Sequence, residues 1–312
     1  MTQIICGVDV SSEALDARIG RDGADVRVAA TPEGVADLAA FCREHQVRLV
    51  VMEATGGYEK LVHAVLWSHG VPAAIVNPRA VRQFAKAMGF LEKTDRIDAG
   101  VIAWYADTKH IVAQEPPSDA QQHLKALVTR LRQLTELRTM QSNQRRLVGD
   151  PDVNGLFSEL LALIARQTRA LETEIAALIG SDPVWHKLDE CFRSIKGVAD
   201  RTVARIMAEM PEIGTVSGKA ASKLIGLAPL ADDSGKPQGK RSISGGRANL
   251  RNILFVVAET VRRHNPDFAA FHERLTAKGK AKKVIRVALA HKLLVQLNAK
   301  ARDARKELAL AA

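Results

Sequence analysis

The sequence predicts an α/β domain followed by a longer, mainly helical region, and three observations support this fold class. Residues 3–76 alternate short apolar runs with helical segments in the order strand, strand, strand, helix, strand, helix, strand. Residues 119–180 hold two long stretches of helical periodicity joined by a Gly-Asp-Pro turn. The remaining residues also show helical spacing. We therefore predict three domains, over residues 1–115, 116–185 and 186–312.

The first domain is predicted to contain a sheet of the ribonuclease-H type. A helix is expected to open at Thr31-Pro32-Glu33, with proline at its first position, and another to follow Gly56-Gly57. The order of elements, with acidic residues at the ends of two strands, favours this sheet. No G-x-G-x-x-G follows the first strand, so the pattern is not that of a Rossmann domain. Strands are expected over 4–10, 15–20, 26–28, 48–53 and 71–76, and residues 79–110 are expected to be helical.

Composition excludes several classes of protein. Of the 312 residues 46% are hydrophobic and 26% charged, as in ordinary globular proteins, and only 4% are aromatic, which argues against RNA binding by a stacked-aromatic sheet. No apolar run is long enough to span a membrane, and no basic signal region opens the chain. The cysteines Cys6, Cys42 and Cys191 are far apart, which favours reduced thiols and excludes a cysteine-rich zinc site. We expect a cytoplasmic protein associated with the nucleoid.

The net charge of +10 is concentrated in the last quarter of the chain. Residues 1–112 hold 12 basic and 14 acidic side chains, a net charge of −2, whereas residues 236–312 hold 18 and 5, a net charge of +13. Apolar residues at helical spacing lie between these basic residues, which indicates a folded basic surface. Such a surface is typical of a protein that binds a polyanion, although a solvated basic tail also fits the charge alone.

The second predicted helix of the hairpin carries a heptad repeat. Two interpretations fit it equally: packing within the chain, or a coiled coil that joins two copies as part of a dimer or tetramer. The repeat consists of Phe157, Ile164, Leu171 and Leu178, with Leu161 and Ile175 at the alternate spacing.

Residues 195–204 resemble one arm of a helix-hairpin-helix, a motif that binds the DNA backbone. In such hairpins the N–H groups at a helix start hold a phosphate. Gly197 matches the first glycine of the motif, and Ala199 replaces the second. A simple connection between two helices fits the same residues.

Four acidic residues are the candidates for chemistry. Asp9 lies in an apolar strand, Glu53 ends another, and Asp95 and Asp98 share one face of a predicted helix that Thr94 caps. Taken singly, each has a structural explanation as a turn residue, a cap or a charge in a first helical turn. As a set they match the several carboxylates that a two-metal phosphoryl-transfer site needs, and they predict bound Mg²⁺.

Three blocks that contain these acids resemble the DEDD-type transposases of insertion sequences. The blocks are Gly7-Val8-Asp9-Val10, Glu53 to Tyr58, and Lys93 to Ala99. This family is related to the Piv DNA invertase, includes bridge-RNA-guided recombinases, and has an N-terminal domain similar to the resolvase RuvC. The later segments Leu224 to Pro229, Ser234-Gly235, Gly245-Gly246-Arg247 and Leu250-Arg251 resemble its C-terminal transposase domain.

The resemblance implies a mechanism and its partners. Family members are thought to cut double-stranded DNA at element ends through a serine nucleophile while the four acids hold Mg²⁺, with an RNA guide. The nucleophile maps to Ser234, with Ser242 and Ser244 as rival hydroxyls. Phosphate contacts are expected from Lys236, Lys240, Arg241, Arg247 and Arg251. The run that opens the last helix, with Lys280, Lys282 and Lys283, is expected to hold a DNA or RNA backbone.

Three other functions remain compatible with parts of the sequence. The four acids alone would suit a RuvC-like endonuclease that uses water as its nucleophile. The hairpin and basic helices alone would suit a DNA-binding protein without catalytic activity. Gly7-Val8-Asp9-Val10-Ser11-Ser12 and Thr55-Gly56-Gly57 suggest an actin-like phosphotransferase, but the helical remainder supplies no second phosphate-binding half-domain.

Overall fold

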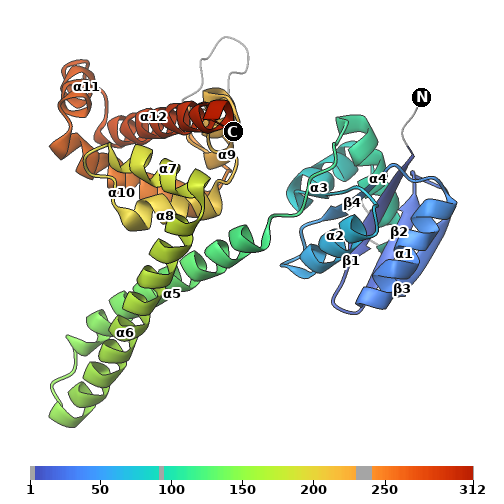
Figure 1. Cartoon of the computed structure of the whole chain (residues 1–312), viewed down its shortest axis with the longest axis horizontal. Helices are drawn as coiled ribbons and strands as arrows, with labels where there is room; N and C mark the ends of the chain where they lie inside the picture. The colour runs from blue at the N-terminus through green and yellow to red at the C-terminus, as the bar shows by residue number, and fades with distance from the viewer. Residues whose placement is uncertain (1–3, 91–94, 230–240, 312) are drawn as a thin grey trace. The chain divides into compact units, whose positions relative to one another are not determined.

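The computed structural model describes residues 4–90, 95–229 and 241–311, and the chain divides into two compact units, residues 1–117 and 118–312 (Figure 1). Two hydrophobic clusters belong to the first unit and one large cluster belongs to the second. The further division at residue 185 stays a prediction.

A mixed five-stranded sheet forms the centre of the first unit. The strand order is β3-β2-β1-β4-β5. The pairs β1–β2 and β2–β3 are antiparallel, and the pairs β1–β4 and β4–β5 are parallel. The first and fourth strands are therefore neighbours, and the arrangement is consistent with the predicted ribonuclease-H-like domain. The strands are β1 (Ile5–Val10), β2 (Ala14–Ile19), β3 (Asp25–Ala29), β4 (Leu49–Glu53) and β5 (Ala73–Val76).

Each face of this sheet has its own core. The cluster with Cys6, Val8 and Met52 packs against α1 (Pro32–Glu44) and α2 (Tyr58–Ser68). The cluster with Ile5 and Val51 packs against α3 (Pro78–Ala87) and α4 (Asp95–Lys109). Because side chains alternate along a strand, the odd-numbered residues of β1 and β4 lie on the α3 and α4 side of the sheet.

The segment predicted as helical over 79–110 is two helices. α3 ends at Ala87, and Gly89 then adopts the left-handed backbone (φ 85°) that is common just after a helix end. The predicted cap Thr94 lies outside the described residues, and α4 begins directly after it, at Asp95.

The cysteines are free thiols, as expected. The hydrogen bond with Cys42, together with burial, raises the pKa of the Cys6 thiol well above its usual value. Cys6 therefore stays protonated at neutral pH and acts as a small core residue rather than a nucleophile.

The secondary-structure elements described in the second unit are all helices. Turns occur at Gly197 and Gly214, as predicted. The helices are α5 (Asp119–Arg145), α6 (Pro151–Ser181), α7 (Pro183–Arg193), α8 (Asp200–Glu209), α9 (Gly218–Ile225), α10 (Ala248–His264), α11 (Pro266–Ala277) and α12 (Lys282–Ala311).

Helices α5 and α6 lie side by side as a long hairpin that extends from the helical body of this unit (Figure 1). Leu124 and Ile175, near its base, belong to the same core as α7 to α12. All six residues of the predicted heptad repeat are buried or half-buried. The repeat therefore serves packing within the chain, and the dimer or tetramer stays a prediction. Within the described ranges no helix is long and apolar enough to cross a membrane.

Candidate active site

The pairing of β1 with β4 places Asp9 beside Glu53. The register runs in parallel from Ile5 opposite Leu49 to Val8 opposite Met52, and the next step brings the two acids to adjacent positions. Neighbouring strands lie about 4.8 Å apart, and both acids are odd-numbered, so both lie on the α4 side of the sheet. Two carboxylates that are 44 positions apart in the sequence thus share one edge of the sheet.

Helix α4 approaches this edge because β1 contains a glycine. A Cβ atom on Gly7 would lie 2.0 Å from the carbonyl oxygen of Ala99 and 2.6 Å from the backbone nitrogen of Ala103. Further along α4, Trp104 lines a small cavity together with Ile5, at the start of β1. The helix therefore runs towards the start of β1, and its first turn lies towards the end where Asp9 stands.

That first turn carries the other two predicted acids. α4 begins at Asp95, and Asp98 is half-buried one turn into the helix. The side chain of Asp95 lies outside the described residues. The backbone thus brings Asp9, Glu53 and Asp98 to the same end of the same face of the sheet.

The chemistry of these side chains suits a hard cation. Mg²⁺ takes oxygen ligands, and in phosphoryl-transfer sites it is bound through one or two carboxylates together with substrate phosphates and water. Among the side chains that the structure describes, no three of the Asp, Glu, His and Cys type are grouped closely enough to hold an ion. The carboxylates of Asp9 and Glu53 on adjacent strands are ligands of the kind that Mg²⁺ takes, and phosphate oxygens would supply further ones.

A fifth acid on this face, Asp16, was missed by sequence reasoning. The antiparallel register places Asp16 directly opposite Asp9, which puts both side chains on one face. Arg27 on β3 pairs with Asp16 at 3.2 Å and offsets its charge. In sequence Asp16 is one polar residue in an alternating strand, and only the register shows its place.

The loop that follows Glu53 is held by Glu59, which sequence reasoning also missed. One carboxylate oxygen of Glu59 accepts hydrogen bonds from the backbone N–H groups of Thr55 at 3.0 Å and Gly57 at 2.8 Å. These amides belong to the Thr-Gly-Gly segment that suggested an actin-like phosphotransferase. Because a carboxylate of the chain itself already binds them, the segment is not built as an open phosphate loop.

The predicted phosphate-binding residues of the second unit divide into two groups. Arg247 pairs with Glu212 at 2.5 Å and donates to the carbonyl oxygen of Glu209 at 2.8 Å. Arg251 donates to the carbonyl oxygens of Gly245 and Ile225. Both therefore hold the segment before α10 in place, and their contact with phosphate stays a prediction. In contrast, Arg241, Lys280, Lys282 and Lys283 are exposed.

The remaining candidates divide by whether they lie in the described part of the chain. Ser234, Lys236 and Lys240 lie outside the described residues, so the structure places none of them. The rival hydroxyls Ser242 and Ser244 are both exposed.

Part of the basic charge in the last quarter serves packing. Lys292 donates to the carbonyl oxygen of Asp267 at 2.8 Å, and its Nζ atom lies 4.6 Å from the ring centre of Phe268. Arg305 donates to the carbonyl oxygens of Ile213 at 3.0 Å and Pro211 at 3.1 Å. Burial lowers the pKa of Arg305 from its usual value. The surface available to a polyanion is thus smaller than the sequence count of +13 indicates.

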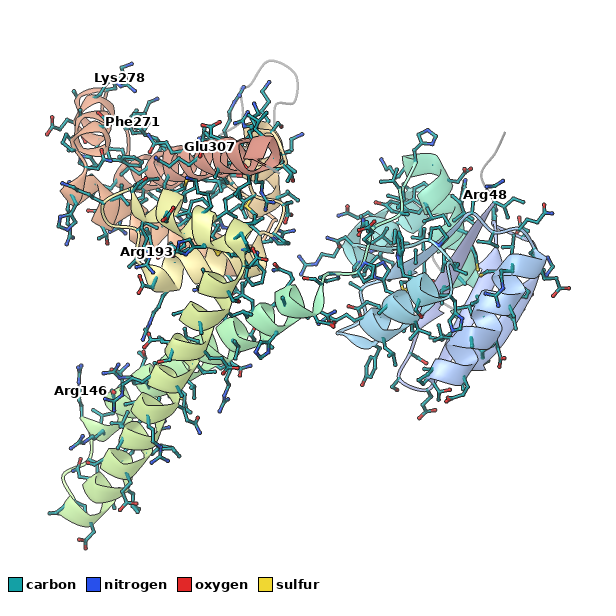
Figure 2. The ribbon with its side chains drawn as sticks, in the orientation of Figure 1. Arg48, Arg146, Arg193, Phe271, Lys278 and Glu307 are labelled. Atoms are coloured by element: carbon teal, nitrogen blue, oxygen red, sulfur yellow. The ribbon has the colours of Figure 1, made fainter. Side chains whose placement is uncertain are left out.

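The segment that resembles a helix-hairpin-helix is a tight turn between α7 and α8. A Cβ atom on Gly197 would lie 3.0 Å from the backbone of Val261, so this glycine allows α10 to pack closely. Arg193, labelled in Figure 2, pairs with both Asp189 and Asp200 at 2.9 Å. The turn therefore has a packing role, and its phosphate contact stays a prediction.

Comparison with known proteins finds two family matches and two relatives of this chain. Residues 6–148 match the profile of the DEDD transposase domain of IS110 elements, described as "Transposase", and residues 189–273 match "Transposase IS116/IS110/IS902 family". The pilin gene-inverting proteins of Moraxella lacunata and Moraxella bovis are each 28% identical over 309 residues, covering 94% of this chain and 94% of theirs.

A ribonuclease-H-like sheet in the first unit, together with the two matched transposase domains, defines a DNA recombinase of the transposase class. The chain belongs to the DEDD-type IS110 family of transposases and is related to the pilin gene-inverting proteins.

Proposed function

We propose that this transposase cuts and rejoins DNA through a covalent serine–DNA intermediate, with Mg²⁺ held by Asp9, Glu53, Asp95 and Asp98. The observation that carries the proposal is the β1–β4 register, which sets Asp9 beside Glu53 on the face covered by α4. When bound, Mg²⁺ would stabilise the charge that develops on the phosphate.

The nucleophile in this proposal is the hydroxyl of Ser234, which lies within the matched transposase domain. Its Oγ atom attacks a backbone phosphorus atom, an Oγ–P bond forms, and the P–O bond to one sugar breaks. The serine proton passes to a base, and the sugar leaves as a free hydroxyl. Attack by the hydroxyl of a second strand reverses these changes and restores the serine. Each cycle conserves the number of phosphodiester bonds, so no nucleotide cofactor is needed.

Ser234→Ala is expected to remove the covalent adduct, because alanine has no oxygen to attack phosphorus. The measurement is a denaturing gel of the full chain incubated with labelled element-end DNA and Mg²⁺. Ser242→Ala and Ser244→Ala are matched controls and should retain the adduct. An adduct that survives in Ser234→Ala would exclude this residue as the nucleophile. Strand cleavage without any adduct in the unmodified chain would favour the endonuclease that uses water.

The further partners in this proposal are a guide RNA and additional copies of the chain. Support for a polyanion comes from the exposed lysines between α11 and α12. The family relationship supports strand exchange as such, and the related Moraxella proteins are named for inversion of a pilin gene. Sequencing RNA that copurifies with the full chain tests the guide, and we expect one non-coding RNA from the element itself. Recovery of random cellular RNA alone would contradict this expectation.

Removal of the exposed lysines that open α12 is expected to weaken DNA binding and flatten its salt dependence. All three lysines are exposed. Lys280 lies in the turn after α11, where Figure 2 labels Lys278, and Lys282 and Lys283 are the first two residues of α12. Each lost phosphate contact lowers the slope of log K against log salt by about 0.9, so the triple Lys→Gln variant should lose roughly 2 to 3 in slope. The exposed lysines Lys86, Lys109 and Lys125, changed together, provide the control. Equal slopes in the two variants would refute this binding surface.

A further inference from the structure

Glu59 is a buried carboxylate in the first turn of α2. Its exposed fraction is 6%, among the lowest of the acidic residues that the structure describes. A buried carboxylate is costly unless it accepts hydrogen bonds, and bonds from N–H groups to a charged oxygen are short and strong. Here one oxygen, Oε2, accepts from both Thr55 and Gly57. Both donors are backbone groups of the chain itself.

The two amides that Glu59 binds belong to the four-residue link between Glu53 and α2. Within this link Gly56 has φ 76° and Gly57 has φ 124°, backbone conformations that other residues rarely adopt. Gly57 occupies the cap position of α2 and supplies no side-chain cap. Thr55 contributes a buried hydroxyl oxygen with no hydrogen-bond partner among the described residues. The link therefore has little stabilisation of its own and depends on Glu59.

Glu53 lies at the junction between this link and the sheet. On the strand side, pairing continues one residue beyond Glu53, because the N–H group of Ala54 donates to the carbonyl oxygen of Val76 at 3.1 Å. On the other side, the next backbone groups with hydrogen bonds described above are the amides of Thr55 and Gly57, which donate to Glu59. The backbone of Glu53 is thus held by strand pairing on one side and by the Glu59 carboxylate on the other.

We infer that Glu59 is a positioning residue, whose carboxylate fixes the backbone of residues 54–57 and thereby the direction of the Glu53 side chain. This inference rests on the proposed role of Glu53 as a carboxylate that binds Mg²⁺. Because both hydrogen bonds end on one oxygen atom, the property required at position 59 is a single acceptor at that point. A glutamine carbonyl can supply such an acceptor, whereas an apolar side chain of the same length cannot.

Amide hydrogen exchange in the metal-free full chain tests the first half of this inference. Glu59→Met keeps the length of the side chain and removes the acceptor, so exchange in the peptide over residues 53–58 should be at least about tenfold faster. Glu59→Gln should exchange much as the unmodified chain does. Glu59→Asp, which keeps the charge but is too short to reach both amides, gives a second reading if Glu59→Met does not fold. Unchanged exchange in both Glu59→Met and Glu59→Asp would overturn the inference.

Mg²⁺ titration of DNA cleavage tests the second half. The Mg²⁺ concentration at half-maximal cleavage should rise several-fold in Glu59→Met and stay near the original value in Glu59→Gln. DNA affinity should be unchanged in both variants. Faster exchange with an unchanged Mg²⁺ midpoint would overturn the positioning role. Glu53→Gln separates the two proposals: if that variant still cleaves normally, the metal site fails, whereas the exchange result for Glu59 stands on its own.

Discussion

Asp9→Asn is expected to reduce DNA cleavage by roughly a thousandfold or more while leaving DNA affinity within about twofold. Asparagine has nearly the same size but no negative charge, and a metal ion contributes several kcal/mol of transition-state stabilisation, which corresponds to about three powers of ten in rate. DNA affinity should persist because the basic surface lies in the second unit. Single-turnover cleavage and gel-shift titration of the same preparation give the two quantities.

Asp16→Asn is the matched control for this experiment. Asp16 stands directly opposite Asp9 on the next strand, on the same face, but its charge is paired with Arg27 at 3.2 Å. We expect the cleavage rate of Asp16→Asn to fall by less than about tenfold, because a nearby charge that water can reach changes the energy of the site by only about 1 kcal/mol. Equal losses in the two variants would show that general negative charge on this face, rather than Asp9 itself, supports cleavage.

Gly7→Ala is expected to destabilise the first unit and abolish cleavage together. The new methyl group would lie 2.0 Å from the Ala99 oxygen and 2.6 Å from the Ala103 nitrogen, and both are backbone atoms of α4 that cannot turn aside. The helix must therefore move, and Asp98 moves with it. Overpacking typically costs about 1–3 kcal/mol, and a clash this close with backbone atoms belongs at the upper end of that range. Urea denaturation, followed in parallel with cleavage, measures both effects.

A second glycine provides the control for this substitution. Gly155 is exposed in the second turn of α6, and a Cβ atom there would meet nothing within 4 Å. Alanine at this position should stabilise the helix by up to about 1 kcal/mol, because it has the higher helix propensity. A urea midpoint for Gly7→Ala equal to that of the unmodified chain would contradict the close packing of α4 on β1.

The sequence predicts the elements of the first unit well because each depends on local signals. Apolar runs bounded by glycine and polar turns mark β1 and β4, and a proline at the first position marks α1. Asp9 and Glu53 stand out because a charge is unusual in or at the end of an apolar strand. The heptad repeat of α6 likewise predicts the packed side of the hairpin.

Tertiary contacts are what the sequence does not show. Asp16 becomes a neighbour of Asp9 only through strand register, and Gly7 matters only because α4 covers it. Arg247 resembles any other basic residue until it meets Glu212, which is 35 positions away. Lys292 likewise counts towards a basic surface until α11 places an aromatic ring beneath it. Pairings between distant segments decide such roles, and no local pattern encodes them.

The direction in which α4 crosses β1 has an electrostatic consequence for the carboxylates at this edge of the sheet. The aligned peptide dipoles of a helix give its N-terminus about half a positive charge, which favours nearby anions by about 0.3–1 kcal/mol each. Because α4 begins at Asp95 and runs towards the start of β1, its positive end faces the edge that carries Asp9 and Glu53. The helix therefore offsets part of the repulsion among the carboxylates. In the proposed metal role of these acids, a cation would meet carboxylates whose backbone positions the sheet and α4 already fix.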